Sequence, residues 1–189
     1  MRKMNVKAYL KIKVINEKGK CIYYRRYRSR SFVANFINAL YTLLSNQGAT
    51  LVNTGGGTYT PKSGFAMQVA DSSNDGSYGI QIGSGTTAPA ITDYRLTQLI
   101  PNGTSAGQMQ YGAVTVMSPV INTTNNTGYI TVTRAFTNNS GGSITVSEVG
   151  LVVQYNYKYV LIIHDLLPTP ITVPNGSTLS IAYEIQIAT

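Results

Sequence analysis

The stretch NVKAYLKIKV, residues 5–14, alternates regularly between two kinds of side chain. Its even-numbered residues are all apolar, and its odd-numbered residues from 7 to 13 are three lysines and a tyrosine. A period of two is typical of a β-strand that buries one face. The stretch therefore predicts a strand with an apolar inner face and a row of lysines on its outer face.

A second strand is predicted directly after the first. Residues 16–20 (NEKGK) are turn-forming, and residues 21–28 (CIYYRRYR) are rich in tyrosine, which favours strands. The two runs predict a β-hairpin arm, residues 1–30, appended to the rest of the chain.

This hairpin carries nearly all of the positive charge. The net charge is +8, yet residues 1–30 contain eleven Lys or Arg and a single acid, Glu17, whereas the other 159 residues are close to neutral. We therefore expect an anionic partner for residues 1–30: nucleic acid, a lipid surface or an acidic patch on a neighbouring subunit. Interleaved Tyr and Arg could stack bases and pair phosphates, or could anchor a subunit contact. The candidate contact residues are Lys7, Lys11, Lys13, Tyr23, Tyr24, Arg25, Arg26, Tyr27, Arg28 and Arg30.

The pattern changes to a helical one over residues 31–47. Apolar residues recur there at intervals of three and four, Ser31 or Ser29 is placed to cap the first turn, and Gly48 to end the last. The apolar stripe is wide, so the helix is expected to pack into the domain or against a partner.

Residues 48–189 are predicted to form a β-sandwich domain. Short β-prone runs alternate there with Gly, Asn, Pro and Ser, and no βα alternation occurs. The predicted class is mainly β, an antiparallel β-sandwich or jelly-roll-like domain with an N-terminal β-hairpin and one α-helix. The predicted strands are residues 49–54, 65–70, 78–83, 109–117, 128–137, 143–155, 158–164 and 178–187.

Residues 79–96, GIQIGSGTTAPAITDYRL, are the most specific part of the sequence. They resemble the GxGTTAP…D..L segment of structural proteins of tailed phages and archaeal viruses, and the resemblance extends over about residues 78–189. It implies a β-sandwich component of a virus particle, from a tail, another appendage or a shell. It makes no prediction for the basic hairpin or the helix.

The same residues can be interpreted without the family. Gly83 and Gly85 would permit positive φ at the end of a strand, Pro89 would stiffen the exit, and Asp93 would accept hydrogen bonds from amides of the following turn. Glu148 is expected to be a structural carboxylate that holds a loop backbone.

The sequence offers little for catalysis. His164 is the sole histidine, which excludes a histidine-rich metal site, and a catalytic triad would need it as the base. Asp165 would point away from it on a strand. The one cysteine, Cys21, excludes an intrachain disulfide. We therefore expect no enzyme activity, no catalytic residues, no metal and no cofactor.

Only 12% of the residues are charged, which suits a subunit packed against copies of itself. The apolar run at residues 32–44 is too short and too interrupted to span a membrane. We expect a virion structural protein in an extracellular particle, whose partners are its own copies, other virion proteins and, through residues 1–30, nucleic acid. The alternatives are a surface-displayed carbohydrate- or receptor-binding module that uses loops 54–64 and 101–108, and a cell-surface filament subunit joined by strand exchange.

Overall fold

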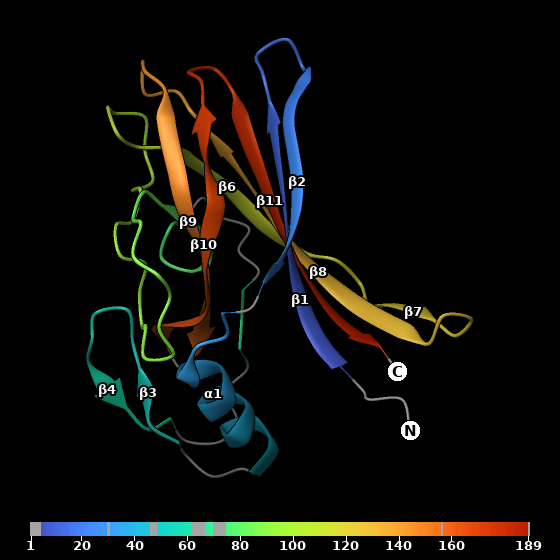
Figure 1. The fold of residues 1–189 in the computed structure, drawn as a ribbon. Helices are drawn as coiled ribbons and strands as arrows, with labels where there is room; N and C mark the ends of the chain where they lie inside the picture. The colour runs from blue at the N-terminus through green and yellow to red at the C-terminus, as the bar shows by residue number, and fades with distance from the viewer. Residues whose placement is uncertain are drawn as a thin grey trace.

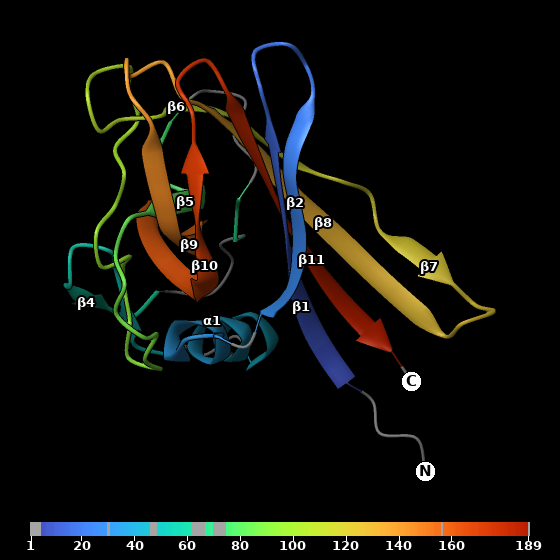
Figure 2. The ribbon, with the colours of Figure 1, turned by 45° about the horizontal axis from the view of Figure 1, so that its top comes forward.

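Two antiparallel sheets pack face to face in the computed structural model, which describes residues 5–29, 31–45, 49–61, 67–69, 75–155 and 157–188 (Figures 1 and 2). The larger sheet runs in the order β2 (Cys21–Ser29), β1 (Asn5–Ile15), β11 (Thr178–Ala188), β8 (Thr127–Thr137) and β6 (Gln110–Val116), and β7 (Val120–Asn122) pairs with the start of β8. The smaller sheet runs β10 (Lys158–Val173), β9 (Ile144–Tyr155) and β5 (Gly79–Gly83). A short ribbon of β3 (Leu51–Val52) and β4 (Thr58–Tyr59) and one helix, α1 (Ala34–Ser45), complete the fold. The predicted mainly β sandwich with a hairpin and one helix is confirmed.

The predicted N-terminal hairpin exists as β1 and β2, but it is not an appended arm. β1 lies between β2 and β11 and pairs with β11 along its whole length, from Asn5 opposite Ala188 to Ile15 opposite Thr178. Since its apolar face supplies part of the core, the boundary expected near residue 30 does not separate two structural units.

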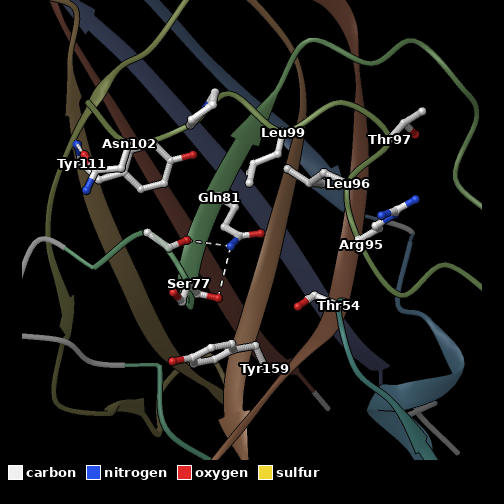
Figure 3. Close-up of a pocket in the computed structure, with 12 residues that line it drawn as sticks. Thr54, Ser77, Gln81, Arg95, Leu96, Thr97, Leu99, Asn102, Tyr111 and Tyr159 are labelled. Atoms are coloured by element: carbon white, nitrogen blue, oxygen red, sulfur yellow. Dashed lines mark hydrogen bonds between the residues drawn. The ribbon is translucent and has the colours of Figure 1, made fainter. Parts of the chain in front are cut away.

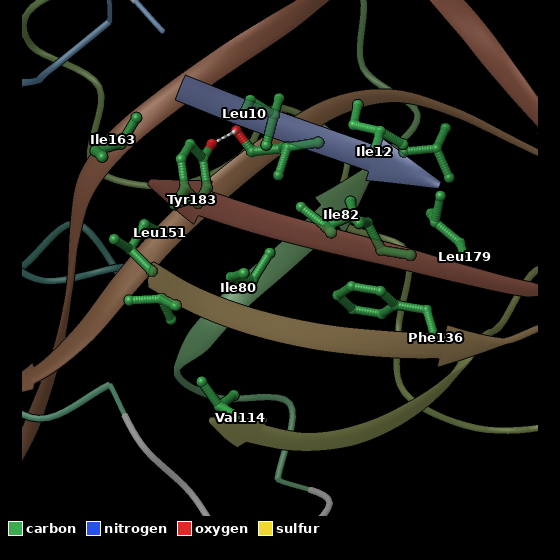
Figure 4. Packing of buried hydrophobic residues seen from close by; sticks show 14 of the residues in the cluster. Leu10, Ile12, Ile80, Ile82, Val114, Phe136, Leu151, Ile163, Leu179 and Tyr183 are labelled. Carbon is green, nitrogen blue, oxygen red and sulfur yellow. Dashed lines mark hydrogen bonds between the residues drawn. The ribbon is translucent and has the colours of Figure 1, made fainter. Parts of the chain in front are cut away.

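The core lies between the inner faces of the two sheets (Figure 4). Leu10 and Ile12 of β1, Tyr183 of β11 and Ile80 of β5 each have at most 1% of their surface exposed. Tyr111 and Phe136 meet edge to face, with ring centroids 4.7 Å apart. Strand alternation alone places these side chains inside, because every second residue of each strand faces the opposite sheet.

The helix begins later than the sequence suggested. Ser31 and Ser29 were expected to cap it, but the residues before Ala34 follow the edge of β10: the Val33 amide donates to the Ile162 carbonyl, and the His164 amide donates to the Ser31 carbonyl. The backbone groups of residues 31–33 therefore extend the smaller sheet instead of starting a helix. The predicted stop at Gly48 lies outside the described residues.

Strand β10 continues nine residues beyond the predicted end at residue 164. The extension includes Pro168 and Pro170, although proline cannot donate to a sheet ladder. Both lie where the pairing with β9 shifts register, between Leu166 and Ile171, on an edge strand that tolerates them.

Other strand predictions were less accurate. Of the predicted strand 49–54 only β3 forms, and β4 and β7 were not predicted. The predicted strand 65–70 lies partly outside the described residues, and within 67–69 Gln68 makes an isolated bridge with Gln154.

Candidate functional site

The motif segment 79–96 is fixed to the smaller sheet by one carboxylate. Glu148 of β9 has no exposed surface and accepts hydrogen bonds from the amides of Gly85 (3.1 Å), Thr97 (3.0 Å) and Gln98 (2.7 Å). The prediction that Glu148 is a structural carboxylate holding a loop backbone fits this geometry.

Gly83 and Gly85 are required for space and not for positive φ. Neither has a positive φ, so that expectation was wrong. A Cβ atom would lie 2.4 Å from Glu148 Oε1 if added at Gly83, and 2.5 Å from it if added at Gly85. The two glycines let the loop backbone approach the carboxylate closely enough for its amides to bind it.

His164 of β10 lies between two carboxylates. Its Nε2 is 2.9 Å from Glu148 Oε2 and its Nδ1 is 2.7 Å from Asp93 Oδ2. Asp93 also accepts a hydrogen bond from the amide of Ala90, at 2.8 Å. It therefore binds the preceding turn, whereas binding to the following turn had been expected. Pro89 lies beside this turn and is partly buried. The cluster Glu148–His164–Asp93 therefore joins both ends of the motif to β9 and β10.

The geometry favours a doubly protonated His164, because each ring nitrogen faces a carboxylate oxygen. Burial alone would lower the pKa of His164, but the hydrogen bonds and charges of Glu148 and Asp93 outweigh it and raise that pKa above 6.5. Burial alone would raise the pKa of Glu148, but hydrogen bonds from His164 and from the Gln98 and Thr97 amides hold it below 4.5. Both shifts favour an ion pair between His164 and Glu148.

This cluster is poorly arranged for acid–base catalysis. His164 is 1% exposed and both of its nitrogens are occupied, so neither is free to take a proton from a substrate. Asp165 turns away from it and accepts from the Tyr183 hydroxyl at 3.1 Å, as strand alternation predicted. Among the described residues, no three His, Cys, Asp or Glu side chains are placed to hold a metal ion.

The predicted contact residues divide between the two faces of the hairpin. Lys7, Lys11, Lys13, Tyr24, Arg26 and Arg28 lie on the outer face of the larger sheet, which we call the basic face. Glu184 of β11 lies among them and pairs with Lys11 and, at 3.0 Å, with Arg26. Burial alone would raise the pKa of Glu184, but these two bonds lower it.

Tyr23, Arg25 and Tyr27 lie on the opposite face of β2. The two tyrosine hydroxyls are 2.8 Å apart and their rings pack against the edge of the core. Burial and the hydrogen bond with Tyr27 raise the pKa of Tyr23 to about 12. These two tyrosines therefore contribute to packing. Arg30, also predicted as a contact residue, lies outside the described residues.

A pocket of about 580 Å³, lined by both polar and apolar residues, opens beside the motif (Figure 3). Gln81 lines it and donates to the carbonyls of Gly76 and Ser77, at 2.7 and 3.2 Å. Tyr159 stacks on Tyr78, with ring centroids 5.8 Å apart and planes at 9°. The other polar residues that line the pocket are Thr54, Arg95, Thr97 and Asn102.

The inner face of the larger sheet is left uncovered at one end. The smaller sheet buries Leu10, Tyr183 and Val132, which lie opposite one another on β1, β11 and β8. Four residues from these along each strand, the corresponding row on the same face is exposed. We call this the apolar row: Val6 (57% exposed), Ile187 (48%), Gly128 and Ile121 (69%). It borders a shallow apolar hollow of about 250 Å³.

Helix α1 also turns apolar side chains outward. Asn35, Ala39 and Thr42 form its buried side, whereas Ile37 is 61% and Tyr41 52% exposed. Asn35 faces inward because its side chain hydrogen-bonds both the amide and the carbonyl of Val52. The helix and the apolar row lie at the same end of the molecule (Figures 1 and 2).

Sequence reasoning missed Arg134, which is 1% exposed inside the core. Its guanidinium donates to the carbonyls of Gly112 (2.8 Å), Tyr78 (2.7 Å), Ile80 (3.2 Å) and Asp75, and so holds the segment before β5 against the larger sheet. The available signal was its position in phase with the inward-facing Val132 and Phe136.

No protein family, curated protein or solved structure matches this chain. The part of the chain that the structure describes contains no helix long and apolar enough to cross a membrane.

Proposed function

We propose that this chain is a structural subunit of a virus particle, which assembles with copies of itself and with other virion proteins and acts by burying surface and not by catalysis. The observation that carries the proposal is the uncovered apolar row at the end of the larger sheet. Contiguous exposed apolar surface is typical of interaction sites in otherwise polar proteins.

A second copy of the chain is the partner that fits this row best. The row belongs to a sheet face, and the layer that covers the neighbouring Leu10, Tyr183 and Val132 is another sheet. A two-fold axis would bring two such rows together, so that each copy supplies the missing cover of the other. The row carries no charged residue that would oppose this contact.

The virion setting is supported by the resemblance of residues 79–96 to viral structural proteins. In the structure this segment is a loop held by Glu148, His164 and Asp93, and their buried contacts suit a rigid structural part. Localisation to an extracellular particle follows from this setting and is part of the proposal.

Replacing one residue of the apolar row tests the assembly surface. We expect Ile187→Lys to lower the mass of the assembled species in light scattering on a sizing column, because it places a charge in the buried contact. Ile22→Lys is the matched control, since Ile22 is also a strand residue, is 46% exposed and lies outside the row. Equal effects of the two substitutions, or none from Ile187→Lys, would count against the row as the contact.

The pocket beside the motif favours a second candidate function, a displayed carbohydrate-binding module. Its neutral polar groups, Arg95 and the stacked ring of Tyr159 are of the kind that bind sugars, and Thr54 and Asn102 come from the two loops expected for this role. Binding to an oligosaccharide array that is lost in Arg95→Ala would support it. If the native protein binds no oligosaccharide on the array, this candidate function is ruled out.

The filament alternative receives less support from the pairing of β1. It required the N-terminal strand to complete a neighbour's sheet, whereas β1 completes the sheet of its own chain.

A further inference from the structure

We propose that the basic face of the larger sheet binds single-stranded nucleic acid. This inference goes beyond the proposed function, because assembly through the apolar row would occur with or without it. The basic face and the apolar row lie on opposite faces of the same sheet, since their residues alternate along β1.

The positive charge of this face is not neutralised within the chain. Glu184 is the one acid among the outward side chains of β1, β2 and β11, and it pairs with Lys11 and Arg26. Within the described residues, Lys7, Lys13 and Arg28 have no carboxylate partner. The face therefore presents several cations to whatever lies against it.

The described residues of a second copy of the chain offer little negative charge to this face. Of the six acids that the structure describes, Glu17 alone is exposed, and Asp75 is half-buried. Asp93 and Glu148 are held by His164, Asp165 is buried beside Tyr183, and Glu184 belongs to the basic face itself. An anion of another kind therefore suits this face better than a second copy of the chain does.

The arrangement of the face suits an extended polyanion. Successive outward side chains along a strand are about 7 Å apart, so Lys7, Lys11 and Lys13 extend over about 20 Å of β1. Arg26 and Arg28 form a parallel row on β2, directly opposite Lys11 and Tyr9. Two adjacent rows of cations can follow one phosphodiester backbone.

The aromatic residues favour a single strand over a duplex. Tyr24 is 53% exposed beside Lys13, where its ring can stack on a base. The Arg26 guanidinium lies 3.6 Å from the centre of the Tyr9 ring, which leaves the other face of that planar group available for stacking. A duplex hides its base faces, whereas a sheet with aromatic and cationic side chains binds unpaired bases. A lipid surface fits less well, because a single exposed aliphatic side chain, Ile22 at the turn end of β2, borders the basic face in the described hairpin and offers little to insert.

The test measures fluorescence anisotropy of a labelled 20-nucleotide oligothymidine with the full-length protein at several salt concentrations. We expect salt-dependent binding that is tighter than to a duplex of the same length. Lys7→Gln/Lys13→Gln/Arg28→Gln should weaken binding by at least roughly tenfold and reduce the salt slope by about 2, since each lost phosphate contact in a single strand contributes about 0.7.

Lys18→Gln/Lys20→Gln/Lys158→Gln is the matched control, because it removes the same charge away from the basic face. It should retain most of the affinity, and both variants should keep the native unfolding midpoint and assembled mass. Three results would overturn the proposal: no binding by the native protein, equal loss in the two variants, or equal or tighter binding to the duplex. Binding to vesicles of anionic lipid with no binding to the oligonucleotide would assign the face to a membrane and also overturn it.

Discussion

Glu148 shows how one buried side chain can determine the path of a loop distant in sequence. Its carboxylate accepts hydrogen bonds from three backbone amides within residues 85–98 and from the ring of His164. Gly83 and Gly85 have no side chain and so leave room for this carboxylate. The sequence indicated a structural role for Glu148 but not its partners, because Asp93, Glu148 and His164 come from a loop and two strands that only the folded sheet brings together. Positive φ was the wrong explanation for Gly83 and Gly85. The sequence alone does not show whether a glycine is needed for its backbone conformation or because a side chain would not fit.

Glu148→Gln should lower the free energy of unfolding by about 3–5 kcal/mol, because it leaves His164 and the loop amides without their buried anion. The measurement is urea unfolding followed by circular dichroism at fixed protein concentration. Glu17→Gln, on the exposed hairpin turn, should change the same quantity by no more than about 0.5 kcal/mol. A Glu148→Gln variant as stable as that control would contradict the structural role.

The same cluster predicts how stability depends on pH. The pKa of His164 is raised above 6.5 in the folded state, so its contribution is complete below pH 6.5 and is lost as pH rises through the folded pKa. The pKa of Glu148 is lowered, so its contribution is present above pH 4.5 and is lost as pH falls through the folded value. The free energy of unfolding should therefore fall on both sides of the window from pH 4.5 to 6.5.

Urea unfolding at a series of pH values measures this profile, and His164→Gln identifies its alkaline limb. The variant should be less stable, and its stability should depend less on pH above 6.5. The assignment of a doubly protonated His164 is wrong if the free energy of unfolding of the native protein does not decline above pH 6.5, or if that decline is unchanged in His164→Gln.

At the scale of elements, periodicity predicted the strands well and their ends poorly. β1 follows directly from the alternation of residues 5–14, and β8, β9 and β11 lie close to their predicted ranges. β10 extends nine residues past its predicted end, and the sequence does not reveal that the strand lies at an edge, which tolerates Pro168 and Pro170. The start of α1 was misplaced because residues 31–33 hydrogen-bond to β10, a tertiary contact that outweighs the cap signal.

The central position of β1 makes the hairpin essential for folding. Deleting residues 1–30 removes Leu10, Ile12 and Val14 from the core, a loss of about 5–9 kcal/mol of apolar burial. Typical domains are stable by only about 5–15 kcal/mol. We expect the truncated chain to lack a cooperative thermal transition in circular dichroism.

Deletion of residues 1–4 alone is the control for this truncation and should leave the transition in place. A cooperatively folded protein without residues 1–30 would show that the hairpin is a separable arm after all.

At the scale of the whole molecule, the two faces of the larger sheet differ in chemistry. One face covers the core and ends in the apolar row, and the other carries the basic face. The sequence predicted the uneven distribution of charge and the low charge of the remaining chain. It did not predict the apolar row, because exposure of Val6 and Ile187 depends on where the smaller sheet stops. A subunit with these two faces can contact its copies through one and a polyanion through the other.

The central claim is self-assembly, and the absolute mass of the purified full-length protein tests it most directly. We would measure light scattering on a sizing column over a range of protein concentrations and image each peak by electron microscopy. The account predicts a discrete assembly larger than the 20.4 kDa chain, with a defined symmetry. A protein that remains a 20.4 kDa monomer at the highest concentration would contradict it.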